Sequence, residues 1–121
     1  MKTVPVVKKE GKIIYDTPEF LDIREIICSK AEKISGEYRS VFVTAEGEYV
    51  LCTSNDLIAE LLAQESEFFR VDRGVVANLQ QDEVKIDFKE RLIYYFNPNH
   101  IIPVAASRIK ALKEYVERLL N

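Results

Sequence analysis

The fold is decided first by residues 68–78, FFRVDRGVVAN. Two short runs of aromatic and β-branched residues, 68–71 and 75–77, flank Asp72-Arg73-Gly74. Residues of these types favour strands, and an Asp-x-Gly sequence between two such runs is typical of a tight turn. The stretch therefore predicts two short strands with Arg73 at the tip of the turn between them.

Further strands are predicted on both sides of this stretch. Upstream, the predicted pairs are 4–7 with 12–15, around a Lys-Lys-Glu-Gly turn, and 39–44 with 48–53, around Ala45-Glu46-Gly47. Downstream, 83–88 pairs with 92–96, and 101–104 is the last strand. We interpret the apolar segment 23–28 as one more strand, with a short helix over 20–28 as the alternative, and the polar segment 29–38, which contains Gly36, as a loop.

Two segments have the period of an amphipathic helix. The first, 55–63, begins within Ser54-Asn55-Asp56, whose residue types are typical of helix N-caps. The second, about 105–119, places Ile109, Leu112, Val116 and Leu119 on one face. We therefore expect a fold that is mostly β with minor α, with about nine short strands, a short middle helix and a C-terminal helix.

The composition fits one globular domain over residues 1–121, with 47% hydrophobic and 31% charged residues. No apolar run approaches the roughly 18 residues of a membrane helix, and the N-terminus lacks the apolar core of a signal peptide. We expect a cytoplasmic protein without a membrane segment. Cys28 and Cys52 lie in apolar stretches without a neighbouring His, which predicts two buried, reduced thiols and no metal site.

Nothing in the sequence has the pattern of a catalytic site. His100 is the single histidine, and no motif places a Ser, Cys or Asp beside it. Asp82, Glu83 and Asp87 lack the spacing of a calcium loop, and the four glycines form no phosphate-binding loop. We expect no enzyme, no cofactor and no small-molecule substrate.

The stretch 68–78 resembles the signature of the LytTR (LytR/AlgR-type) DNA-binding domain family, F-x-R-V/C-H-R-S-x-L/V-V-N. Residues 41–44 and 47–49 resemble the family's t-x-dG-x-y hairpin, and 55–63 resembles its helical sL-x-x-l-x-x-xL segment. Ile102-Pro103-Val104 and the Lys-bearing helix after it resemble the closing iPVSRR-x-x-x-x-LK. The resemblance runs from about Val4 to Leu120, and the order and spacing of its parts make it specific.

This resemblance implies small antiparallel sheets and a transcriptional regulator that reads duplex DNA with loop side chains, standing alone without a receiver domain. By position, it places Arg39, Arg73 and the pair Ser107-Arg108 at the DNA. Arginine can bond guanine O6 and N7 with two N–H groups in the major groove. The expected set of DNA-binding residues is Arg39, Arg70, Arg73, Ser107, Arg108 and Lys110.

The chain departs from the family pattern where DNA would lie. Asp72 stands for the family's His, Gly74 for its Ser, and Ala105 and Ala106 for the first two residues of Ser-Arg-Arg. An anion beside Arg73 and a net charge of −3 disfavour phosphate contacts. The alternative is therefore a LytTR-like module that binds protein and modulates another regulator.

The same residues can also have purely structural roles, without contact to DNA. Arg73 can be an exposed turn residue paired with Asp72, Arg70 can cover an edge strand, and Arg108 and Lys110 can solvate the polar face of the last helix. The consecutive aromatics Tyr94-Tyr95-Phe96 force at least one ring outward, which we interpret as part of a subunit contact. The partners expected besides DNA are thus a second copy, bound on repeated half-sites, or a partner regulator.

Overall fold

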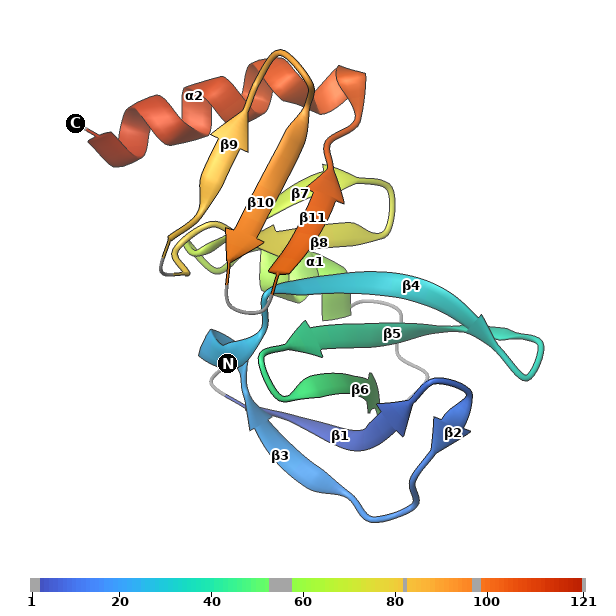
Figure 1. Ribbon diagram of the computed structural model, residues 1–121. Coiled ribbons are helices and arrows are strands. Elements are labelled where there is room, and N and C mark those ends of the chain that lie inside the picture. The colour runs from blue at the N-terminus through green and yellow to red at the C-terminus, as the bar shows by residue number, and fades with distance from the viewer. Residues whose placement is uncertain (1–2, 53–57, 82, 97–98, 121) are drawn as a thin grey trace.

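The computed structural model describes residues 3–52, 58–81, 83–96 and 99–120, which form eleven strands and two α-helices (Figure 1). The strands are β1 (Thr3–Glu10), β2 (Ile13–Ile14), β3 (Glu19–Asp22), β4 (Cys28–Ile34), β5 (Glu37–Thr44), β6 (Gly47–Leu51), β7 (Phe68–Asp72), β8 (Val75–Asn78), β9 (Lys85–Asp87), β10 (Leu92–Phe96) and β11 (Asn99–Pro103). The helices are α1 (Ile58–Ala63) and α2 (Ile109–Leu120), and Ile23–Glu25 and Ala106–Arg108 form short 3₁₀ turns. The prediction of a mostly-β fold is confirmed.

The strands form two antiparallel sheets. The larger sheet has the order β2-β1-β6-β5-β4-β8-β7, with β3 also pairing to β1, and the smaller has the order β11-β10-β9. In Figure 1 the small sheet stands above the larger one, and α2 crosses the top of the molecule behind it. The predicted strand pairs around Gly11, Ala45-Glu46, Asp72-Arg73-Gly74 and Lys89-Glu90-Arg91 are all present.

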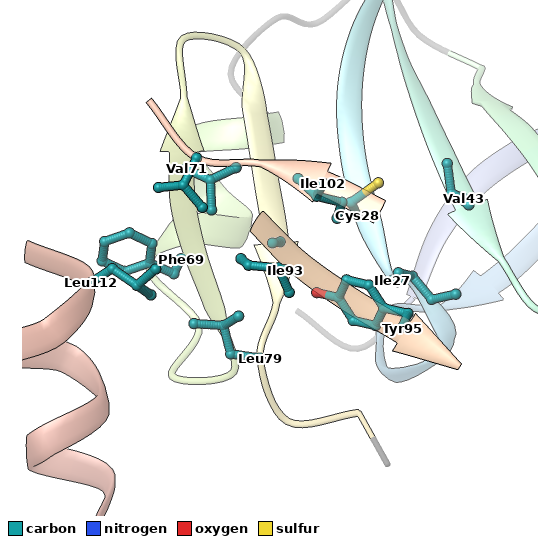
Figure 2. Close-up of a cluster of buried hydrophobic side chains, with 12 residues drawn as sticks. Ile27, Cys28, Val43, Phe69, Val71, Leu79, Ile93, Tyr95, Ile102 and Leu112 are labelled. Carbon is teal, nitrogen blue, oxygen red and sulfur yellow. The ribbon is translucent and has the colours of Figure 1, made fainter. Parts of the chain in front are cut away.

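The hydrophobic core has two parts. The first lies on one face of the larger sheet, with Phe42, Leu62 and Phe68 among its buried residues. The second joins the two sheets and α2, and Figure 2 shows its side chains converging from all three. Leu112 of α2 and Ile93 of β10 are fully buried there. Burying large apolar side chains stabilises a fold by about 1.5–3 kcal/mol each, so this second cluster fixes α2 and the small sheet against β7.

The expectation of a loop over 29–38 is wrong, because β4 and β5 form a long hairpin there, paired from Cys28↔Val43 to Ile34↔Glu37. The turn is made by Ser35 and Gly36, both with positive φ (51° and 85°), as two-residue hairpin turns favour. The polar side chains Lys30 and Glu32 form ion pairs with residues on β1 and β6. A strand stabilised by cross-strand ion pairs lacks the apolar alternation that reveals a strand in sequence.

The segment before β4 also differs from the prediction of a strand over 23–28. Ile23–Glu25 forms a 3₁₀ turn capped by Asp22, whose carboxylate accepts the backbone N–H of Arg24 at 2.9 Å. Residues 19–22, for which the sequence predicts no strand, form β3 because β1 is long enough to pair with them beyond its pairing with β2. The capping residues predicted at 54–56 lie outside the described residues.

The two cysteines differ. Cys28 is buried, as predicted, whereas Cys52 is exposed, so the prediction for Cys52 is wrong. Cys52 follows the last residue of β6, and its backbone N–H still bonds the Pro5 carbonyl at 2.9 Å. Tyr49, Val50 and Leu51 are all buried, and exposure begins at Cys52 because this residue lies past the end of the strand. No helix in the described part of the chain has the length and apolar character to cross a membrane.

Candidate DNA interface

Three of the segments singled out from the sequence lie toward the same side of the molecule. These are the β4–β5 hairpin with Arg39, the β7–β8 turn with Arg73, and the start of α2 with Ser107 and Arg108. Figure 1 shows all three extending to the right-hand side, away from β9 and the C-terminus. The fold thus brings together side chains that are up to about seventy positions apart in the sequence.

Direct contacts fix these segments to one another. The backbone N–H of Ala105 donates to the Val71 carbonyl at 2.8 Å, which ties the start of α2 to β7. Gly74 has φ +74° and lies against β4, where a Cβ on Gly74 would stand 3.4 Å from the Cβ of Ala31. A residue with a side chain would therefore be strained at Gly74 by its backbone conformation. The β7–β8 turn is consequently held between β4 and α2.

Arg73 is exposed at the tip of this turn. The Asp72 carboxylate accepts the backbone N–H of Arg73 at 2.7 Å. Among the described residues, the Arg73 guanidinium forms no ion pair with Asp72 or with any other carboxylate. Asp72 therefore orders the turn, and the Arg73 side chain keeps all its donors for a ligand.

Arg108 is held against β7. Its Nε donates to the Arg70 carbonyl oxygen at 2.9 Å, and its guanidinium carbon lies 4.8 Å from the centre of the Phe69 ring. The remaining guanidinium N–H groups keep their capacity to donate. Ser107 and Lys110 are exposed beside it, whereas Arg70 and Arg108 are half-buried.

Arg39 is turned inward. Its Nη2 donates to the Leu51 carbonyl at the end of β6, and its buried Nε has no hydrogen-bond partner among the described residues. The residue opposite it on β4 is Glu32. Among the residues predicted to contact DNA, Arg39 would therefore need the largest change of side-chain conformation to reach a base.

A groove of about 430 Å³ opens between the end of α1, β7 and α2. Arg70, Arg108 and Arg118 line it, together with Tyr115, whose hydroxyl donates to the Ser66 carbonyl. Arg118 lies outside the set of DNA-binding residues predicted from the sequence. Its spacing is the signal that could have found it, because 108, 115 and 118 follow the i, i+7, i+10 pattern of one helix face.

The sequence suggested no histidine near either cysteine, yet the fold brings one to Cys28. The Sγ of Cys28 lies 3.8 Å from the Nε2 of His100, across the junction of the two sheets. Burial raises the pKa of Cys28 to about 12, and burial with help from Lys30 lowers the pKa of His100. One protonated thiol and one imidazole are too few for a structural zinc site, which takes four ligands.

One family of known proteins matches most of the chain. The model of the LytTr DNA-binding domain matches residues 19–117. Among solved structures, the LytTr DNA-binding domain of a putative methyl-accepting/DNA response regulator from Bacillus cereus is similar, with a TM-score of 0.67 and 13% sequence identity. The similarity covers 96% of this chain and 97% of that chain, and at this identity it shows the fold alone. No curated protein matches the chain.

Proposed function

Because the chain belongs to the LytTR DNA-binding domain family, we propose that it binds duplex DNA at specific sequences and regulates transcription in the cytoplasm. The family is one of DNA-binding domains and not of enzymes. The observation that carries the proposal is the exposed Arg73, whose guanidinium forms no ion pair with the described carboxylates, on a turn whose backbone is ordered by Asp72 and Gly74. A pre-ordered backbone reduces the entropy lost when a side chain at its tip binds.

In this proposal Arg73 reads a base. Its guanidinium presents two parallel N–H groups, which match guanine O6 and N7 in the major groove. The absence of a side chain at Gly74 lets the turn approach the groove closely. Reading by an arginine on a turn needs no recognition helix, in agreement with the family's mostly-β fold.

The start of α2 supplies backbone contacts. Ser107 and Lys110 are exposed, and a hydroxyl and an ammonium are common donors to phosphate oxygens. Arg108 and Arg70 position these two side chains, because the hydrogen bond from Arg108 Nε to the Arg70 carbonyl holds the start of α2 against β7. Their free guanidinium N–H groups give a second source of phosphate contacts along the same edge.

Arg39 is proposed as a contact that forms only on binding. To reach DNA, its guanidinium must exchange the bond to the Leu51 carbonyl for one to a base or phosphate. The unsatisfied Nε lowers the cost of that exchange, because an unpaired buried donor is itself unfavourable.

Selection of bound sequences from a random duplex library tests the proposal. Enrichment of one motif is the expected result, and repeated half-sites within it would indicate a homodimer. At least one ring of Tyr94-Tyr95-Phe96 is predicted to face outward, and Phe96 is 50% exposed on the small sheet. Phe96→Ser would therefore separate dimer formation from DNA binding. Failure to enrich any sequence would overturn the proposal in favour of the protein-binding alternative.

A further inference from the structure

The tips of two hairpins face one hollow. The β1–β2 turn contributes Gly11 and Lys12, and the β4–β5 turn contributes Lys33 and Ser35, to a hollow of about 320 Å³. Figure 1 shows both tips on the side of the molecule to which the β7–β8 turn also extends. None of these residues belongs to the set expected from the family resemblance.

Four charged residues beside this hollow neutralise one another. Lys9 and Lys30 each lie within 4 Å of both Glu48 and Glu32, at 3.0 and 3.6 Å for Lys9 and at 3.1 and 3.9 Å for Lys30. This network of two lysines and two glutamates is neutral as a whole. The carboxylate of Glu32 at the floor of the hollow is therefore compensated from both sides.

Lys12 and Lys33 stand outside the network. Both are exposed, and in the described part of the chain neither forms an ion pair with a carboxylate. They add two positive charges to the rim of the hollow that lie outside the ion pairs of the described residues. On a chain with a net charge of −3, such a local excess is a distinct feature of the surface.

This rim continues the edge on which Arg73 lies. Gly74 lies close enough to Ala31 of β4 that an added Cβ would reach the Ala31 Cβ, and Lys33 lies two residues further along the same strand. Two residues of a strand span about 7 Å, and side chains at i and i+2 leave a sheet on the same face. Lys33 thus lies next to the β7–β8 turn along this edge, and Lys12 lies beyond Lys33, on the other hairpin tip that lines the hollow.

We propose that this hollow, with Lys12 and Lys33 on its rim, binds the phosphate backbone of DNA beside the base pairs that Arg73 reads. The inference rests on the proposed function and extends its interface onto the N-terminal hairpin, of which β1 and β2 lie outside the residues matched by the family model. Ammonium groups hold phosphates as point charges without geometric selectivity, so the contact adds affinity and no sequence preference.

A negative charge beside the hollow opposes the contact. Glu37, the first residue of β5, is exposed opposite Ile34, which lines the hollow. A carboxylate there would repel a phosphate bound between the two tips. Removing this charge should therefore strengthen binding, whereas removing Lys12 or Lys33 should weaken it.

The test is the salt dependence of binding to the selected duplex and to a scrambled duplex, measured by fluorescence anisotropy. Two lost phosphate contacts lower the log–log slope by about 1.8, so wild type should lose about twelvefold more affinity than Lys12→Gln/Lys33→Gln between about 50 and 200 mM salt. The difference should be the same on both duplexes. Lys12→Arg/Lys33→Arg should restore the wild-type slope, and Glu37→Gln should raise affinity at low salt.

Lys85→Gln is the control for a lysine away from the hollow, because it removes one positive charge from an exposed position on β9, which Figure 1 shows at the opposite edge from the hairpin tips. Its slope should equal that of wild type. Wild type that binds DNA with the same slope as the double Gln variant would overturn this inference alone. Wild type that binds no duplex would overturn the proposed function with it.

Discussion

The carboxylate of Asp72 accepts the backbone N–H of Arg73 and leaves the Arg73 guanidinium free. At the position where the family signature has His, this chain therefore has an anion that orders the turn. Order and charge have opposite effects on DNA binding, because the same carboxylate that fixes the turn also repels phosphates. The two effects can be separated by substitution.

Arg73→Ala should weaken binding to the preferred duplex by about 1–3 kcal/mol and relax discrimination at one base pair, if the guanidinium reads a guanine edge. Fluorescence anisotropy on a set of single-base variants of the selected duplex measures both effects. A uniform loss on all duplexes with a salt slope lower by about one unit would instead identify a phosphate contact.

Asp72→Asn should strengthen DNA binding. The amide oxygen of Asn can still accept the Arg73 N–H, so the turn is retained, and the negative charge is removed. Asp72→Ala, which loses both, provides the comparison. Equal affinities of wild type and Asp72→Asn for every duplex would mean that this turn does not face DNA.

Arg108→Ala should destabilise the fold by about 1–2 kcal/mol, because it removes the hydrogen bond to the Arg70 carbonyl and the contact with the Phe69 ring. Urea denaturation measures the free energy of unfolding. Lys110→Ala is the control, since Lys110 is exposed and its loss should change stability by less than about 0.5 kcal/mol. Equal stability of the two variants would contradict a positioning role for Arg108.

Cys52 should react with a thiol reagent in the native protein much faster than Cys28. Cys52 is exposed, whereas Cys28 is buried and its pKa is raised to about 12, so almost none of it is thiolate at pH 8. Stopped-flow titration should show one fast thiol and a second only on unfolding. With Cys52→Ser the fast phase should disappear, and a fast phase that persists would place Cys28 at the surface.

The stability of the fold should fall below about pH 7 because of His100. Burial and Lys30 lower its pKa from the ordinary value of 6.5, with Glu48 opposing, so the folded state favours neutral imidazole beside Cys28. The unfolded chain binds the His100 proton at higher pH than the folded protein does. The stability that neutral His100 contributes is therefore complete above pH 6.5, and it is lost as the pH falls toward the pKa of His100 in the folded protein.

The urea midpoints of wild type and His100→Gln between pH 5 and 8 measure this contribution. The midpoint of wild type should fall more steeply with acidification than that of the variant. Both proteins retain Lys30, Glu48 and the other carboxylates, so the difference isolates the imidazole. Parallel curves would show that His100 has the same pKa in the folded and unfolded states.

The sequence by itself determined the β7–β8 hairpin and the pairing of β9 with β10. In each, β-prone residues flank a turn whose chemistry is visible within a few positions, such as Asp72-Arg73-Gly74. It also determined the amphipathic α2, because a period of 3.6 is a local property. The family followed from the order of these local signals.

The tertiary structure alone decided the β4–β5 hairpin, because Lys30 and Glu32 become stable strand residues only when Lys9 and Glu48 arrive from other strands. It likewise decided that Arg39 donates a hydrogen bond to the Leu51 carbonyl and that the His100 imidazole contacts the Cys28 thiol. These interactions join residues 12 to 72 positions apart. Propensity and periodicity describe neighbours along the chain, whereas the partner of a charged or polar side chain is set by which strands the sheet places next to one another.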